Sequence, residues 1–270
     1  MRVYANGRTA EQRDIHPAFF ISLGIGQIIY GPVSDMVGRK APLYFGLVLA
    51  FSTSVAFAAT TPAPFTATYQ VSQGGQAIGQ AVVTLKPAGD GQWEYSNQTK
   101  GTSGLAAALG ANSNETTRFR WNNNAPETVS YDYRMDAAIK SKQRHTNVNW
   151  STNQVTVDEG KGPMNYASVP GLVDRNTAPY AIGLALRAGK QSVALPVAVK
   201  RNVETQTFKV AGKDAVRVPA GSFQAERVER SDDNKAFSAW YAPQKYPVPV
   251  KLAQSDGGNL TLELVSYKGN

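Results

Sequence analysis

The stretch Phe65-Thr66-Ala67-Thr68-Tyr69-Gln70-Val71 decides the fold, because apolar and polar residues alternate in it without a break. A period of two residues puts alternate side chains on opposite faces of a β-strand, so one face of this stretch is expected in a core and the other in solvent. The pair Gly74-Gly75 follows and is typical of a tight hairpin turn. This stretch therefore predicts the first strand of an antiparallel sheet.

The same alternation recurs further along the chain. Phe119 and Trp121 alternate with arginines, and the run from Tyr131 to Met135 alternates aromatic or apolar residues with charged ones. Turn sequences such as Gly89-Asp90-Gly91 separate these runs. We expect about ten to twelve strands in a mainly β fold, an antiparallel meander that forms a barrel or a curved half-barrel.

Two segments interrupt the strand pattern. Residues 174–190 predict a helix, with Asp174 or Thr177 as its cap, Pro179 in its first turn and Gly189 at its end. We expect this helix to pack against one mouth or one face of the sheet. Residues 104–110 are small and apolar, and they predict either a short helix or a loop tip.

The order of several short motifs between Phe65 and Tyr267 resembles the domain of unknown function 3108 family of exported bacterial proteins. The motifs are Tyr69-x-Val71 with Gly74-Gly75 and Gly79, Gly104-Leu105, Arg118-Phe119-Arg120, Val218-Pro219-Ala220-Gly221-x-Phe223, Arg227-Val228-Glu229, Trp240-Tyr241-Ala242-Pro243, Pro247-Val248 and Leu262-Glu263-Leu264. The resemblance implies an exported, largely antiparallel β protein, and it implies no established activity or site.

The first 58 residues predict delivery of this domain across a membrane. Met36 to Lys40 forms a short basic segment, residues 43–55 are apolar, and Ala56 and Ala58 supply the small residues at which a signal peptidase cleaves before Ala59. We divide the chain into an upstream extension (1–35), a signal peptide or membrane helix (36–58), a linker (59–64) and the β domain (65–270). The β domain is expected in the periplasm, either soluble after cleavage or anchored to the inner membrane through an uncleaved leader.

Residues 16–58 also resemble a fragment of a major facilitator superfamily drug exporter of the bicyclomycin/chloramphenicol-resistance type. The motif that carries the resemblance is Gly31-x3-Asp35-x2-Gly38-Arg39-Lys40. In that family the motif is a gating loop between membrane helices, so the resemblance implies that Asp35 and Arg39 are gate residues. The rest of the chain has no comparably apolar span, and transporters of this kind build their sites between many helices. We therefore interpret the motif as non-functional here.

Composition excludes several kinds of chemistry. The chain has no cysteine, which excludes disulfides, thiol nucleophiles and thiolate metal sites. The formal charge is +8, and the 23 basic and 17 acidic residues from Ala59 onward give that part +6. These charges alternate along the chain and form no basic runs, so they indicate a solvated surface.

One set of residues could still form a basic face with aromatic edges. It consists of Arg118, Arg120, Arg134, Lys142, Arg144, Tyr131 and Tyr133, which lie on neighbouring predicted strands. Such a mixture suits single-stranded nucleic acid, but an exported domain is not expected to meet that partner. A solvated sheet face with cross-strand pairs to Asp132 and Asp136 is the favoured interpretation.

The sequence predicts no catalytic residue, no metal site and no cofactor. His145 is the one histidine after the leader, and it lies in an alternating strand without a recognisable partner. We expect a non-catalytic protein of the cell envelope that binds a lipid, an apolar small molecule or an envelope protein, and no nucleic acid. An envelope hydrolase is the alternative, which would need Asp132 or Asp136 clustered with Arg144 or His145.

Overall fold

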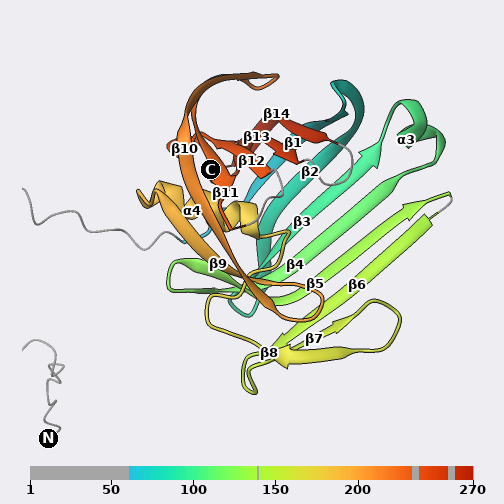
Figure 1. Ribbon diagram of the computed structural model, residues 1–270, viewed down its shortest axis with the longest axis vertical. Coiled ribbons are helices and arrows are strands. Elements are labelled where there is room, and N and C mark those ends of the chain that lie inside the picture. Colours follow the sequence, from blue (N-terminus) through green and yellow to red (C-terminus); the bar gives the residue numbers. More distant parts are fainter. Residues whose placement is uncertain (1–60, 139, 233–236, 255–258, 270) are drawn as a thin grey trace, which may run out of the picture. The chain divides into compact units, whose positions relative to one another are not determined.

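The computed structural model describes residues 61–138, 140–232, 237–254 and 259–269 (Figure 1). The chain divides into two units, residues 1–59 and 60–270, and the described residues all belong to the second. They form 14 strands and the two helices α3 (Gly104–Ala108) and α4 (Ala178–Arg187).

Within the described residues the strands follow one another along the chain, and α3 and α4 are the helices between them. They are β1 (Phe65–Gln73), β2 (Gln76–Gly89), β3 (Gln92–Gly101), β4 (Asn112–Asn122), β5 (Ala125–Ala137), β6 (Lys140–Asn149), β7 (Gln154–Asp158), β8 (Met164–Ala167), β9 (Ser192–Ala198), β10 (Val203–Val218), β11 (Gly221–Arg230), β12 (Phe237–Tyr241), β13 (Pro249–Gln254) and β14 (Leu260–Gly269).

All 14 strands belong to one sheet, in the order β8-β7-β6-β5-β4-β3-β2-β1-β14-β13-β12-β11-β10-β9. Each ladder between neighbours is antiparallel, so the sheet is two meanders that meet where β1 pairs with β14. The register of that pair runs from Phe65 opposite Gly269 to Gln73 opposite Leu260. The first and last strands of the domain are therefore its centre.

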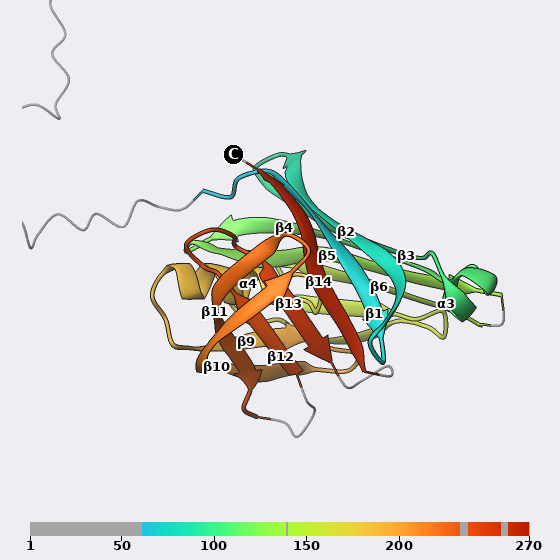
Figure 2. The same cartoon turned by 90° about the horizontal axis from the view of Figure 1, so that it is seen from above.

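The two edge strands of the sheet, β8 and β9, are held near each other. Val173 forms a parallel bridge with Val197 of β9, and its N–H donates to the carbonyl oxygen of Pro196 (2.9 Å). The hydroxyl of Tyr166 on β8 donates to the carbonyl oxygen of Val199, just after β9 (2.6 Å). The sheet thus curves until its edges approach each other, as expected for a barrel or a curved half-barrel (Figures 1 and 2).

The helix α4 is shorter than residues 174–190, the range that the sequence predicts. Residues 174–177 form a turn because the Asp174 carboxylate accepts hydrogen bonds from the backbone N–H groups of Asn176 and Thr177 (2.9 and 3.1 Å). Pro179 lies in the first helical turn as expected, and Gly189 takes a positive φ of 80° just beyond the end of the helix.

Aromatic side chains fill the sheet face against which α4 packs, here called the inner face. Tyr180 of α4 lies among the rings of Phe65, Tyr95 and Phe119, with centroid separations of 6.0, 5.7 and 6.4 Å. These residues belong to one apolar cluster, and Ile182 on the same helix belongs to a second cluster with strands β9–β13. The helix therefore packs against both halves of the sheet.

The predicted fold class is confirmed, although the sheet has more strands than the expected ten to twelve. The short strands β7 and β8 contain five and four residues, and alternation over so few residues is a weak signal. The segment at residues 104–110, left open between helix and loop tip, contains the short helix α3. Among the described residues, no helix has the length and apolarity needed to cross a membrane.

Candidate functional site

A groove of about 400 Å³ opens where strands β4 to β7 lie side by side. Its lining is mostly polar and consists of Asn114, Thr116, Asp132, Tyr133, Arg134, Gln143, Arg144, His145, Asp158 and Gly160. The strand registers place most of these side chains on the face opposite α4, here called the outer face.

One row of cross-strand neighbours forms the middle of the groove. Thr116 pairs with Asp132, Asp132 with His145, and His145 with Asp158. The Nδ1 atom of His145 lies 2.6 Å from Oδ1 of Asp132, and both side chains are more than half exposed (57% and 60%). The imidazole therefore has a carboxylate on the strand at each side and remains accessible to solvent.

A second row completes the lining. Asn114 pairs with Arg134, and Arg134 with Gln143, so amide and guanidinium groups lie next to the row of His145. Gly160 follows β7 with a positive φ of 82°, and a Cβ atom there would lie 3.1 Å from Nε2 of Gln143. The Asp158 carboxylate accepts the Gly160 N–H (2.7 Å), which fixes this turn at the end of the groove.

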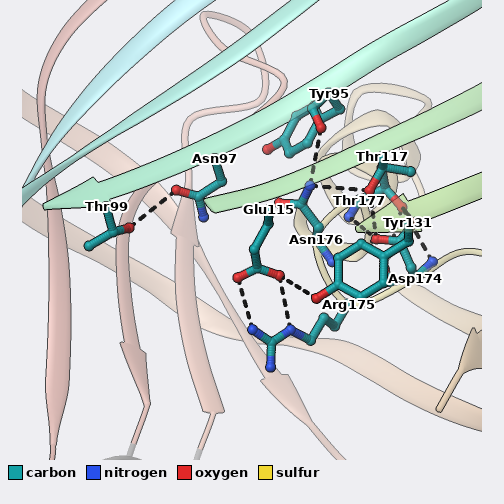
Figure 3. Close-up of polar contacts among 10 residues, drawn as sticks. All are labelled: Tyr95, Asn97, Thr99, Glu115, Thr117, Tyr131, Asp174, Arg175, Asn176 and Thr177. Atoms are coloured by element: carbon teal, nitrogen blue, oxygen red, sulfur yellow. Dashed lines mark hydrogen bonds and ion pairs between the residues drawn. The ribbon is translucent and has the colours of Figure 1, made fainter. Parts of the chain in front are cut away.

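A buried polar cluster lies on the inner face behind these strands (Figure 3). Its centre is Asp174, which accepts hydrogen bonds from the hydroxyls of Thr117, Thr128 and Thr177 (3.0, 2.7 and 3.2 Å) as well as from two backbone N–H groups. Only 1% of Asp174 is exposed. Burial raises the pKa of its carboxyl group, because the hydrogen bonds only partly offset the loss of hydration.

Asn176 extends the cluster to β3. Its Nδ2 donates to the carbonyl oxygen of Tyr95 and to the hydroxyl oxygen of Thr117, both at 3.1 Å. Its Oδ1 is buried, and the described residues offer it no hydrogen-bond donor. This cluster ties residues 174–177 to strands β3, β4 and β5.

An ion pair lies beside the cluster, as Figure 3 also shows. Arg175 binds Glu115 through two nitrogens (2.9 and 3.0 Å), and the Tyr131 hydroxyl donates to the same carboxylate (2.6 Å). The Arg175 guanidinium also lies over the ring of Tyr133, 4.4 Å from its centroid. Burial, followed by the charge of Glu115, raises the pKa of Tyr131, so that residue stays protonated and acts as a donor.

A second ion pair secures the far end of β4 and β5. The buried Glu127 accepts bonds from Arg120 (2.8 Å) and from the Gly171 N–H (2.7 Å), and Arg120 stacks over Trp150 at 4.1 Å. Burial alone would raise the pKa of Glu127, but these bonds outweigh it and lower that pKa. Residues 168–177 thus fix the strands of the groove from behind.

The structure divides the seven residues that the sequence grouped as a basic and aromatic face. Arg118 and Arg134 lie on the outer face, whereas the register of β5 and β6 turns Lys142 and Arg144 to the inner face with Tyr131 and Tyr133. Arg120 lies at the strand end against Glu127. Side-chain alternation therefore does not bring these residues together on one face.

Acidic partners also neutralise most of that set. Arg134 pairs with Asp136 (2.7 Å), Arg144 with Glu159 (2.6 Å) and Arg118 approaches Glu94 (4.0 Å). These ion pairs fit the solvated sheet surface that the sequence favoured. The expected cross-strand pairs to Asp132 and Asp136 do not form within this set in the described residues, because Asp136 pairs with Arg134 of its own strand and Asp132 contacts His145.

Sequence reasoning named Asp132 with His145 only as one of several pairs that a hydrolase would need, and otherwise gave His145 no partner. The register of β5 and β6 makes these two residues direct neighbours, and the position of the turn between the two strands was the signal that could have selected this pair. Sequence reasoning also identified Asp174 only as a helix cap, because nothing in the local sequence shows which threonines lie opposite Asp174.

The other predicted site residues lie outside the described residues. They are Gly31, Asp35, Gly38, Arg39 and Lys40 of the transporter-like motif, and Ala56, Ala58 and Ala59 of the cleavage site. Within the part of the chain that the structure describes, no three His, Asp or Glu side chains are grouped so that they could hold a metal ion.

Comparison with known proteins gives a family and a fold neighbour. The sequence model of a family described as "Protein of unknown function (DUF3108)" matches residues 68–265. A crystal structure described as a β-barrel-like protein of domain of unknown function DUF1849 from Brucella abortus is 11% identical, with a TM-score of 0.46. The alignment covers 76% of this chain and 97% of that one. No curated protein matches the chain.

Proposed function

The chain belongs to the DUF3108 family of proteins of unknown function, and on that premise we propose that its β domain is a non-catalytic binding module of the bacterial cell envelope. The module holds an extended, polar segment of an envelope partner in the groove across β4 to β7. Its signal-peptide-like leader, residues 36–58, supports a periplasmic location for the domain.

The observation that carries this proposal is the chemistry of the groove. About 400 Å³ lies within the usual size of ligand sites, and most of the side chains that line it carry hydroxyl, amide, carboxylate, imidazole or guanidinium groups. These groups offer hydrogen bonds along the groove, so the lining suits a polar ligand. The ligand is therefore a hydrophilic peptide or glycan segment rather than an acyl chain.

The inner face supports the same choice. Rings of Phe65, Tyr95, Phe119 and Tyr180 occupy the position that an apolar ligand would take inside a half-barrel. Displacing α4 to admit a lipid would also break the hydrogen bonds of Asp174. These rings fill the space in which the hypothesis from the sequence placed an apolar ligand. A partner bound at the outer surface is therefore favoured.

The test is a titration followed by amide chemical shifts in the two-dimensional ¹H–¹⁵N spectrum. Polar probes (a tripeptide, a cello-oligosaccharide) and an apolar probe (octanoate) are added separately. We expect a polar probe to shift the amides of Thr116, Asp132 and His145. The double variant Arg134→Ala/His145→Ala should abolish these shifts, whereas Arg118→Ala on the same face should not. Shifts confined to the inner face with octanoate would overturn the proposal.

A hydrolase is the second candidate, because His145 and Asp132 form the arrangement in which a carboxylate orients a general base. The groove supplies Thr116 as the nearest hydroxyl in the same cross-strand row. The exposure of both His145 and Asp132 argues against it, since catalytic dyads are usually shielded from water. Ester or glycoside hydrolysis that disappears in His145→Ala would establish this alternative.

Membrane transport is the third candidate, and it rests only on the transporter-like motif of the leader. We propose that Gly31 to Lys40 plays no part in transport, since efflux needs many helices around a site. Cells that express the chain should gain no resistance to exported drugs. A gain that Asp35→Asn removes would contradict this proposal.

A further inference from the structure

The helix α3 is an apolar projection at the tip of the β3–β4 hairpin. Residues 104–110 read Gly-Leu-Ala-Ala-Ala-Leu-Gly and contain no polar or charged side chain. No residue of the helix is buried, and 74% of Leu105 is exposed, against 37% for Val169 and Val265, the next most exposed large apolar side chains described. Figures 1 and 2 both place α3 at the end of the hairpin, away from α4.

This tip has a fixed conformation. The Ser103 hydroxyl donates to the carbonyl oxygen of Ala77 (2.5 Å), and the Thr102 N–H donates to that of Ile78 (2.9 Å), which ties the tip to β2. A Cβ atom on Gly101 would lie 2.7 Å from the Ala106 carbonyl oxygen, so only glycine lets the helix pack this closely. Leu105 is exposed together with Ala107 and Ala108, so the tip presents an apolar patch rather than one scattered residue, and such a patch indicates a contact surface.

The backbone at the C-terminal end of the tip is satisfied from within, whereas the described residues supply no acceptor for the N–H groups of residues 104–106 in the first turn of α3. The N–H groups of Leu109, Gly110 and Ala111 donate to carbonyl oxygens of the same segment at 2.9 to 3.0 Å. The Leu109 carbonyl oxygen accepts the N–H of Ala138 from the neighbouring β5–β6 hairpin (2.9 Å). An unpaired N–H or C=O group is costly in an apolar medium, so the internal bonds favour a shallow position of the tip in which the N–H groups of the first turn stay hydrated.

Three lysines lie on strands at this end of the sheet, Lys100 on the outer face and Lys140 and Lys142 on the inner face. Lys100 precedes α3, and Lys140 and Lys142 lie on the β5–β6 hairpin that contacts Leu109; all three are exposed. None of the three forms an ion pair with a described residue, whereas Asp136 between the hairpins is already paired with Arg134. This end of the sheet is therefore positive where the tip is apolar.

We propose that α3 inserts Leu105 into the head-group region of an anionic phospholipid surface, with Lys100, Lys140 and Lys142 on the phosphates. An apolar residue in front of a basic collar is the combination that gives interfacial binding, since burial and charge attraction add. Leu105 could also bind in a groove of a partner protein. Such a partner would not explain the three nearby lysines, which form no ion pair with a described residue.

The apolar leader would bind vesicles by itself, so vesicle binding of the full chain does not test the tip. The test therefore uses the full chain with a fluorescent probe at one position of the tip. The chain has no cysteine, so Leu105→Cys places a single environment-sensitive fluorophore at the tip. The chain is reconstituted in vesicles of phosphatidylcholine alone or mixed with phosphatidylglycerol. We expect a blue shift and about a twofold rise in emission with the anionic vesicles, quenched by spin-labelled lipid.

Three controls separate insertion from proximity. The same label at Val265→Cys, a partly exposed apolar position on β14, should show no rise. The charge reversal Lys140→Glu/Lys142→Glu should remove the preference for anionic lipid, and with the label at Ala107→Cys the change Leu105→Asp should remove the response. Emission unchanged at residue 105, or equal in both kinds of vesicle, would overturn the proposal.

Discussion

Asp174 concentrates more hydrogen bonds than any other side chain around the inner face. Three threonine hydroxyls and two backbone N–H groups donate to it, and its surroundings exclude water. A buried acceptor of this kind matters mainly through the donors that it satisfies, because each donor left without a partner costs free energy.

Replacing Asp174 should therefore destabilise the domain, and the loss of stability should grow with the number of hydrogen-bond donors that lose their acceptor. Asp174→Ala leaves all five donors without their acceptor and should lower the free energy of unfolding by about 3 kcal/mol or more, whereas Asp174→Asn keeps one oxygen and should cost about 1–3 kcal/mol. Urea unfolding followed by tryptophan fluorescence measures both. Thr205→Ala, an exposed threonine on β10, serves as control and should change little.

Glu127 gives a pH dependence whose sign is fixed by its lowered pKa. A carboxyl group with a lower pKa in the folded state adds stability above its unfolded pKa of about 4.3, and that stability is lost as the pH falls through the folded value. The stability difference between the wild type and Glu127→Gln should thus be largest near neutral pH and shrink below about pH 4. A difference that grows on acidification would contradict this assignment.

At the scale of elements, α4 depends on a close approach that one glycine permits. A Cβ atom on Gly183 would overlap the carbonyl oxygen of Pro247, so the helix lies directly on the chain between β12 and β13. Sequence alone predicted the existence of the helix from its candidate caps, its proline and the glycine at its end. It could not predict that Gly183 faces another backbone, since a contact between residues so distant in sequence leaves no local pattern.

Gly183→Ala therefore distinguishes packing from helix propensity. Propensity alone would make the substitution stabilising by about 0.5–1 kcal/mol. Because the new methyl group overlaps Pro247, we expect a destabilisation of about 1–3 kcal/mol instead. The matched control is Ala185→Gly, a half-buried position on the same helix, where only the propensity loss of about 1 kcal/mol should appear in thermal unfolding.

For the whole molecule, sequence patterns predicted the class of the fold but not the order of its strands. Alternation in Phe65 to Val71 identified a strand, yet nothing in it indicates that its second neighbour is β14 near the end of the chain. The same holds for the groove: its residues alternate along three hairpins, but only the register shows that His145 lies between Asp132 and Asp158. Register depends on turn lengths and on packing between distant strands, which single-sequence patterns do not contain.

The central position of β1 and β14 and the double attachment of α4 predict that the domain unfolds as one unit. Leu264 of β14 is fully buried in the first apolar cluster, and Ile182 of α4 is buried in the second. Leu264→Ala and Ile182→Ala should each cost about 2–5 kcal/mol and shift a single transition, because neither cluster keeps its packing without the helix and the central pair. Tryptophan fluorescence and far-ultraviolet circular dichroism should then give coincident curves for both variants. Curves that separate in Ile182→Ala alone would instead mean that strands β9 to β13 unfold independently of β1 to β8, and the helix would not couple the two halves.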